Sequence, residues 1–355
     1  MTRAPSRKWS RDDVPQEEAY DAVVVGGGLS GVAAARTLAA SGRRVALLET
    51  TGALGREIVR AGSRFARLDA YAPFSPTIRE FADGLRERGG LFDGGEWDPV
   101  AAAVVFDDLL ERRGVTVRFL TWPSRLLVDG RKVVGVEHAS GAGRAAWLAP
   151  RVIDASAQGK LARAWFAETP VRRPPFSMIH IIYTSVKGEC PDRTTIRPSA
   201  AAEPLTVSCR PTGRPEERRV TLAANARRTR AEWLLTLDAA LPALLERIPA
   251  LRSGLLAHLA DDAAAAPAYE ISTGSDDRSV AGYVWAAEGA PATPLPPEPS
   301  VPIHTGMFCR PDALEGFFLA GPWLRGCPWD LRDEETGIAN GFRIGEIVGA
   351  EAARR

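Results

Sequence analysis

The chain has 355 residues, of which 45% are hydrophobic and 25% are charged, so its composition is that of a globular protein long enough for two domains. Its formal net charge of +1 excludes a general electrostatic attraction to nucleic acid or to an anionic membrane. No apolar run is long enough to span a membrane, and no secretory signal is visible, so we expect a cytoplasmic protein with reduced thiols. The four cysteines fit no metal or C-x-x-C redox pattern; they are Cys190, Cys209, Cys309 and Cys327.

The first structured unit follows a polar segment, 1–18, that we expect to be a disordered lead-in. Residues 21–49 then give a strand, a glycine turn, a helix, a second strand and an acid, in that order. The turn matches G-x-G-x-x-G through Gly26, Gly28 and Gly31. These glycines allow a tight turn, a close approach of the backbone to a pyrophosphate, and close packing of helix on strand.

The ends of this unit indicate which nucleotide it binds. The helix predicted from Leu29 to Ser41 directs its free N-terminal amides at an anion in the turn. The second strand, 43–48, ends at Glu49, which is placed to accept hydrogen bonds from an adenosine ribose. An acid at this position favours a free 2′-hydroxyl and repels a 2′-phosphate. The unit is therefore predicted to bind FAD or NAD rather than NADP.

The next segments read as helices and then strands. Apolar spacing predicts helices over 76–89 and 98–113. Asp129-Gly130, between two apolar runs, predicts a β-hairpin. Strands are expected at 115–120, 126–128, 133–137, 147–149 and 151–155.

The character of the chain changes after about residue 165. The segment 230–260 is predicted to be largely helical, with interruptions at Pro242 and Pro249. A proline-rich connector, 290–302, precedes an apolar strand at 316–320 and a closing helix over 336–353. One inserted sheet is expected from the strands at 177–186, 204–209, 219–222, 269–272 and 283–285.

This order of elements predicts an α/β fold with two parts. Residues 19–164 and 306–355 are expected to form one discontinuous Rossmann-type nucleotide-binding domain, a parallel sheet with a β-hairpin crossover. Residues 165–305 are expected to form an inserted α+β substrate domain.

Three separated segments resemble one protein family. They are the glycine turn at 26–31, VVGV…RVIDASAQGKLA at 133–162, and GFFLAGPW…ETGIANGFRIGEIVG at 316–349. Together they resemble the FAD-dependent oxidoreductases that have a glutathione-reductase-like FAD domain. The resemblance implies FAD as the cofactor and is much weaker from 165 to 305, so it implies no substrate.

The resemblance also implies roles for individual residues. Glu49 would hold the adenosine ribose, and Arg56 would contact a phosphate or the ribityl chain. Amides at the start of the last helix would stabilise negative charge at flavin N1 and O2. The implied FAD-binding residues are Gly26, Gly28, Leu29, Ser30, Gly31, Glu49, Thr50, Arg56, Ala155, Ser156, Gly321, Pro322, Thr336, Gly337 and Ile338.

Several motifs that mark particular classes of flavoenzyme are missing, which reduces the number of reactions to consider. A second G-x-G-x-x-G is missing, which argues against a built-in NAD(P)H domain, and the missing cysteine pair argues against a disulfide reductase. The G-D-A-x-H ending of aromatic hydroxylases and the W-x-W-x-I-P of flavin halogenases are also missing. We therefore expect electrons to enter from a small organic substrate and to leave to oxygen or to an acceptor protein. An FAD monooxygenase, a non-catalytic FAD- or NAD-binding module, and a flavin-free NAD dehydrogenase are the alternatives.

Two histidines are candidates for the base that hydride removal from C–OH or C–NH needs near flavin N5. His304 and His180 both lie in the predicted substrate domain. The alternative for each is a structural histidine with no role in the reaction.

The loop before the last helix, WLRGCPWDLR, is expected to face the flavin ring. Asp330 or Arg332 could orient a substrate there. Cys327 could be a reactive thiol or a flavin tether, or an inert buried residue. Trp323 and Trp329 could form the wall of the pocket or pack in the core.

Overall fold

The structure is a computed structural model that describes residues 15–171, 175–199, 202–286, 298–325, 327, 329 and 333–355. Most of the predicted lead-in and of the predicted proline-rich connector lies outside these residues. Within the described part of the lead-in, Gln16–Ala19 form strand β1.

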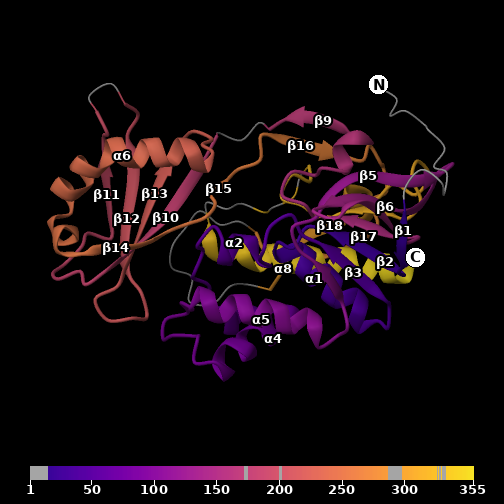
Figure 1. The fold of residues 1–355 in the computed structure, drawn as a ribbon, viewed down its shortest axis with the longest axis horizontal. Helices are drawn as coiled ribbons and strands as arrows, with labels where there is room; N and C mark the ends of the chain where they lie inside the picture. The colour runs from indigo at the N-terminus through magenta and orange to yellow at the C-terminus, as the bar shows by residue number, and fades with distance from the viewer. Residues whose placement is uncertain are drawn as a thin grey trace.

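A parallel five-stranded sheet forms the centre of the larger part of the molecule (Figure 1). Four of its strands are buried along their whole length, as is typical of parallel sheets that are covered on both faces. The strand from the far end of the chain completes the sheet, and the arrangement confirms the predicted α/β fold class. In spatial order the strands are β19 (Phe317–Leu319), β8 (Val152–Asp154), β2 (Ala22–Val25), β3 (Val45–Leu48) and β4 (Thr116–Arg118).

Two helices from opposite ends of the chain, α1 (Leu29–Ala40) and α8 (Glu334–Arg354), pack directly against each other. The contact is made by backbone. A Cβ atom at Gly345 of α8 would overlap the carbonyl oxygen of Ser30, and one at Gly349 would lie 2.9 Å from the carbonyl oxygen of Ala34. The glycines of α8 therefore let the last helix approach the first.

The other helices of this part surround the sheet. The helices predicted over 76–89 and 98–113 are confirmed, and each begins at a capping side chain, Ser75 or Asp98, that accepts hydrogen bonds from first-turn amides. The helices are α2 (Arg56–Val59), α3 (Leu68–Tyr71), α4 (Pro76–Glu87), α5 (Pro99–Glu111), α7 (Thr305–Phe308) and the 3₁₀ turn η1 (Ala162–Ala164).

A second sheet contains the predicted hairpin. Its tight turn places Asp129 opposite Lys132, and Gly130 adopts a φ of 60°, which confirms the hairpin at Asp129-Gly130. The four strands, in spatial order, are β1, β7 (Gly143–Leu148), β6 (Lys132–Ser140) and β5 (Trp122–Asp129).

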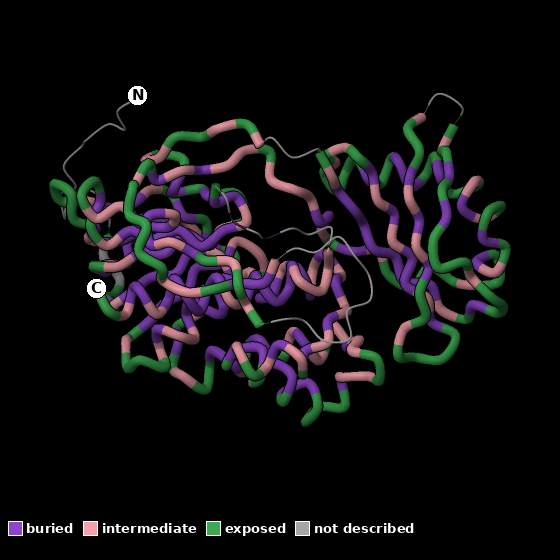
Figure 2. The backbone as a smooth tube through the Cα atoms, turned by 180° about the vertical axis from the view of Figure 1, so that it is seen from behind, coloured by how far each residue is buried: buried purple, intermediate pink, exposed green. Residues whose placement is uncertain are grey.

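The inserted part is a six-stranded sheet with one long helix, α6 (Arg230–Arg247), on one face (Figure 1). It lies at the end of the molecule opposite the chain termini and has its own buried cluster, separate from the core around the parallel sheet (Figure 2). Its strands are β11 (Arg193–Ile196), β12 (Leu205–Pro211), β13 (Arg218–Ala224), β10 (Ser177–Thr184) and β14 (Leu255–Leu259), with β15 (Ala264–Ala265) also paired to β10.

The predicted helix over 230–260 was wrong in two respects. Helix α6 continues through Pro242, because that residue lies on the exposed side while Trp233 and Leu244 anchor the other side in the core. After a 3₁₀ turn, η2 (Pro249–Ser253), the chain forms strand β14 at the sheet edge instead of more helix. A short apolar run such as LLAHL does not distinguish the two states.

The strands predicted at 269–272 and 283–285 do not join the inserted sheet. Strand β16 (Tyr269–Ser272) pairs with β9 (Ala167–Pro170), and β17 (Val280–Val284) pairs with β18 (Val301–His304). Their apolar residues, including Ile271 in β16, pack in the core around the parallel sheet. Local hydrophobicity predicts a strand but not its partner.

Among the described helices, none combines the length and the apolar character needed to cross a membrane.

Substituting Gly345→Ala tests the close contact of α8 with α1. Alanine is the better helix former by about 1 kcal/mol, yet its methyl group would overlap the Ser30 carbonyl. We expect a net loss of about 1–3 kcal/mol in the free energy of unfolding, measured by denaturant titration. Gly141→Ala is the control, because nothing lies within 4 Å of its added Cβ. Equal stability of G345A and the wild type would contradict the packing described.

Candidate cofactor and active site

The glycine turn between β2 and α1 holds three backbone segments in contact. Gly26 has a φ of 103°, and a Cβ there would lie 2.7 Å from the backbone of Ala155 and Ser156. A Cβ at Gly31 would overlap the carbonyl oxygen of Gly26. The predicted residues Gly26, Gly31, Ala155 and Ser156 are thus brought together at the carboxyl ends of β2 and β8, where open α/β sheets bind ligands.

The start of α1 already binds negatively charged oxygen. The amide of Leu29 donates a hydrogen bond to the Glu57 carboxylate at 3.0 Å. That carboxylate also lies beside Gly28, where a Cβ would be 2.9 Å from Glu57 Oε1. The amide at the start of α1 therefore faces a carboxylate of the chain itself, in the kind of position that suits an anion.

Glu49 is buried and fixed at the end of β3. Its Oε2 accepts a hydrogen bond from the Gly27 amide at 2.6 Å, and its Oε1 accepts hydrogen bonds from the Thr51 amide at 2.7 Å and the Thr50 hydroxyl at 3.2 Å. Thr50 thus supports the acid. The arrangement holds the carboxylate beside the glycine turn, the position that the sequence predicts for a ribose contact.

Arg56 opens α2 and faces the inserted part of the chain. Its Nε donates a hydrogen bond to Asp262 Oδ2 at 2.6 Å. In this structure the guanidinium links α2 to the segment after β14, and its contact with a phosphate or the ribityl chain stays a prediction. The residue next to it, Glu57, has a raised pKa because its carboxyl group is buried.

The second predicted contact region is the turn after β8. Asp154 is buried, and its Oδ1 accepts hydrogen bonds from the Ser156 amide and hydroxyl at 3.1 and 2.6 Å. Its Oδ2 accepts hydrogen bonds from the Leu161 and Ala162 amides, both at 2.8 Å. This network shapes the turn that leads from β8 to η1. Burial raises the pKa of the Asp154 carboxyl.

The strand-end turn at Gly321-Pro322 lies beside this network. The Trp323 indole donates a hydrogen bond to the Ser156 carbonyl at 2.8 Å, and its ring packs against Gly159 and Gly321. Of the two alternatives for Trp323, the structure shows core packing: the side chain is buried under the turn.

The start of α8 is capped by the chain itself. Asp333 Oδ1 accepts a hydrogen bond from the Thr336 amide at 3.2 Å, and the Gly337 amide donates to the Asp333 carbonyl. Ile338 is buried in the core. Glu334 and Glu335, in the first turn, are both ion-paired, to Arg219 and Arg67 respectively.

His180 lies where the inserted sheet meets α2 and α8. It is 3% exposed, its Nδ1 is 2.8 Å from the Thr221 hydroxyl, and its Nε2 has no partner among the described residues. Burial, then the Arg219 charge, lowers its pKa to about 4. The imidazole is therefore neutral at physiological pH.

Three charged residues lie near this histidine, namely Arg219, Glu334 and Arg64. Arg219 binds Glu334 through two hydrogen bonds of 2.6 and 3.0 Å, and Arg64 pairs with Glu217 at 3.1 Å. The Arg64 amide also donates to Glu334 at 2.8 Å. Sequence reasoning missed these residues, although the alternation of Arg219 and Thr221 with the buried apolar residues of β13 is a usable signal.

His304 lies at the other end of α8. Its Nδ1 is 2.8 Å from the Arg278 carbonyl, and Asp277 and Arg355 are nearby. Because α8 has 21 residues and is about 30 Å long, His304 is far from His180, which adjoins the first turn of the helix. The structure does not bring the two predicted bases into one site.

The loop before α8 is described only in part. Asp330 and Arg332 lie outside the described residues. The side chains of Cys327 and Trp329 are buried, and Trp329 packs against Gly341 of α8.

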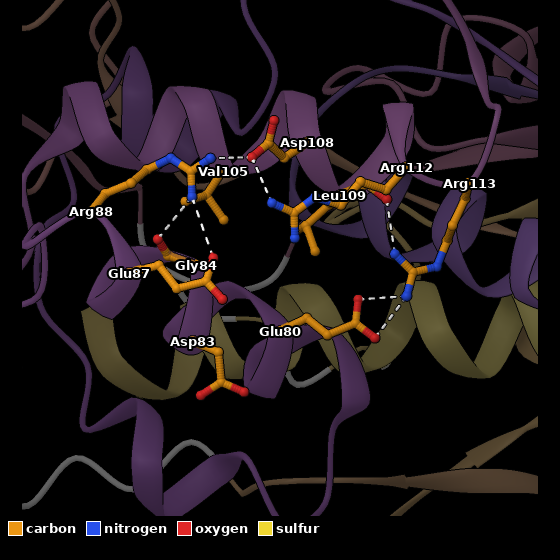
Figure 3. Close-up of a pocket in the computed structure, with 10 residues that line it drawn as sticks. All are labelled: Glu80, Asp83, Gly84, Glu87, Arg88, Val105, Asp108, Leu109, Arg112 and Arg113. Carbon is orange, nitrogen blue, oxygen red and sulfur yellow. Dashed lines mark hydrogen bonds and ion pairs between the residues drawn. The ribbon is translucent and has the colours of Figure 1, made fainter.

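A shallow hollow of about 450 Å³ lies between α4 and α5, away from these residues (Figure 3). Its charged side chains pair with one another, as Arg88 does with Asp108 and Glu80 with Arg113. None of the predicted site residues lines it, so we assign it no role in the site.

Comparisons with known proteins agree with this fold. Residues 21–173 match the family described as FAD dependent oxidoreductase. A geranylgeranyl bacteriochlorophyll reductase-like protein from Thermoplasma acidophilum has 16% identity and a TM-score of 0.62, over 95% of this chain and 78% of its own. No functionally curated protein matches the sequence.

Two further solved structures share the fold. A myxobacterial chondrochloren halogenase has 17% identity and a TM-score of 0.53, over 87% of this chain and 69% of its own. An anhydrotetracycline hydroxylase from Streptomyces rimosus has 15% identity and a TM-score of 0.56, over 95% of this chain and 63% of its own.

The fold and the matched segment define a flavoprotein with a Rossmann-type FAD domain. The matched segment, residues 21–173, is similar to the FAD-dependent oxidoreductases and indicates FAD as the cofactor.

Glu57→Gln tests whether this carboxylate competes with the cofactor for the start of α1. Removing its charge should strengthen FAD binding by about tenfold, or about 1.4 kcal/mol, because the diphosphate no longer displaces an anion from the Leu29 amide. The measurement is the dissociation constant from flavin fluorescence.

The pH dependence provides a second check on Glu57. Because its folded-state pKa is raised, wild-type FAD affinity should increase as the pH falls toward that pKa, and E57Q should lose this dependence. Glu111→Gln, an exposed carboxylate on α5, is the control. Weaker binding by E57Q would show that Glu57 supports the cofactor instead.

Proposed function

We propose that this protein transfers a hydride between a small organic substrate and N5 of its bound flavin, and that oxygen or an acceptor protein reoxidises the cofactor. The observation that carries the proposal is His180. It is the candidate base that is buried and uncharged, and it lies beside the first turn of α8. Its Nε2 has no hydrogen-bond partner among the described residues.

The neutral imidazole suits this reaction. A base must be unprotonated to accept the proton of a C–OH or C–NH group while the hydride leaves. The Thr221 hydroxyl holds Nδ1, so the ring is oriented by β13, and the buried Nε2 has no hydrogen-bond partner among the described residues. For Nε2 to accept a proton, the ring proton must sit on Nδ1. Nδ1 then donates its hydrogen bond to the Thr221 hydroxyl.

The FAD domain supplies the binding residues. We propose that the amides of Leu29 and Ser30 hold the diphosphate, that Glu49 holds the ribose, and that the first turn of α8 adjoins the ring. FAD, when bound, contributes a hydride acceptor at N5. His304, at the far end of α8, has no part in this proposal.

A monooxygenase is the second candidate, because the fold is shared with a hydroxylase and a halogenase. It differs in its source of electrons, which would be a freely diffusing reduced nicotinamide, and in the incorporation of oxygen into the product. A non-catalytic FAD-binding module would undergo neither reaction.

Anaerobic mixing of the FAD-loaded protein with panels of alcohols and amines tests these proposals. The loss of visible flavin absorption with an alcohol or amine, without nicotinamide, is the expected result. Reduction by NADH or NADPH only, followed by oxygen incorporation, would establish the monooxygenase. A flavin that no donor reduces would overturn both enzymatic candidates.

His180→Gln tests the assigned base once a donor is found. We expect the rate constant of flavin reduction to fall by about 10²–10⁴-fold, the usual contribution of a positioned base. The wild-type rate should be constant above about pH 5 and should decrease as the pH falls toward 4, because the imidazole becomes protonated. His258→Gln, an exposed histidine of the same sheet on β14, should react at the wild-type rate. An unchanged rate in H180Q would exclude the assignment.

A further inference from the structure

The residue that joins His180 to the start of α8 is Arg219. In the antiparallel pair β10–β13, His180 lies directly opposite Thr221. Arg219 is two residues from Thr221 on β13, so its side chain emerges from the same face of the sheet as His180 and Thr221. This is the face opposite Val220 and Leu222, which belong to the buried cluster under α6.

Arg219 spans the boundary between the inserted sheet and α8. It is only 3% exposed, and its two terminal nitrogens bind the two carboxylate oxygens of Glu334. Such a bidentate pair fixes the orientation of both side chains as well as their distance. Glu334 is the first residue of α8 and is held a second time by the Arg64 amide.

We propose that Arg219 is a positioning residue for His180, which it holds against the first turn of α8 through the ion pair with Glu334. The inference rests on the proposed function, because His180 acts as a base only in that reaction. Arg219 itself touches neither the reacting atoms nor the imidazole in this scheme. Arg219 acts on His180 in two ways: it fixes the position of β13, and its positive charge disfavours the protonated imidazole.

The charges around His180 support this role. Arg219 on β13 and Arg64 after α2 both disfavour the protonated imidazole, whereas Glu334 on α8 favours it. The two arginines and burial outweigh the single carboxylate, so the pKa of His180 is lowered. Removing Arg219 would leave the Glu334 carboxylate facing the imidazole without its partner, and both changes favour protonation.

The test is a titration of the His180 imidazole by NMR in the FAD-loaded protein, with the signal assigned by its loss in H180Q. Arg219→Met should raise the pKa from about 4 by about one unit or more. Arg219→Lys keeps the charge and should stay close to the wild type. Arg210→Met is the matched control, because Arg210 is exposed and is the cross-strand neighbour of Arg219 on β12.

A charge swap separates positioning from general support of the fold. Arg219→Glu combined with Glu334→Arg restores an ion pair but places a carboxylate on β13 near His180. We expect this double variant to raise the His180 pKa, whereas a purely structural role predicts the wild-type value. Breaking a buried ion pair is strongly destabilising, so R219M alone could fail to fold. The double variant keeps an ion pair and allows the His180 pKa to be measured in that case.

Kinetics provide the second readout. In R219M, the pH at which flavin reduction slows should move upward together with the NMR titration. An unchanged His180 pKa in both R219M and the charge swap would overturn the inference. The two proposals can also fail separately. If R219M shifts the His180 pKa but H180Q reduces flavin at the wild-type rate, Arg219 still controls the imidazole, and His180 is not the base.

Discussion

The direct contact between backbone atoms at the start of α1 is the constraint on which the rest of the site depends. A Cβ atom at Gly31 would overlap the carbonyl oxygen of Gly26, and one at Gly345 would overlap that of Ser30. A Cβ atom at Gly26 would meet the backbone of the turn at Ala155. Side chains at these glycines would separate the helix from the sheet. Because the contact is so close, residues from three distant parts of the chain converge at the start of α1, where the Leu29 amide donates a hydrogen bond to Glu57.

A second constraint, made of charge rather than close packing, connects the inserted sheet to this frame. Arg56 with Asp262, Arg64 with Glu217, and Arg219 with Glu334 join the inserted part to α2, to the segment after α2 and to α8, respectively. Buried ion pairs add little net stability, but they specify geometry, since every unpaired alternative leaves a buried charge. We infer that these pairs hold the sheet face that carries His180 beside the first turn of α8.

Local patterns in the sequence predicted the FAD domain well because its chemistry is encoded within short segments. The glycine turn with Glu49, and the hairpin at Asp129-Gly130, require particular residues at particular spacings. The pairing of β16 with β9, the ion pair of Glu334 and the position of His304 depend on contacts between distant segments. His304 and His180 were equivalent candidates in the sequence, and only the length and direction of α8 separate them.

The most direct test of the account is a crystal structure of the protein with FAD bound. The account predicts a flavin ring between the first turn of α8 and the sheet face of His180, with N5 within reach of a substrate that also contacts Nε2. It also predicts that the Leu29 amide binds a phosphate oxygen in place of Glu57. A ring placed beside β17 and β18, near His304, or a Glu57 that keeps its bond to Leu29, would contradict it.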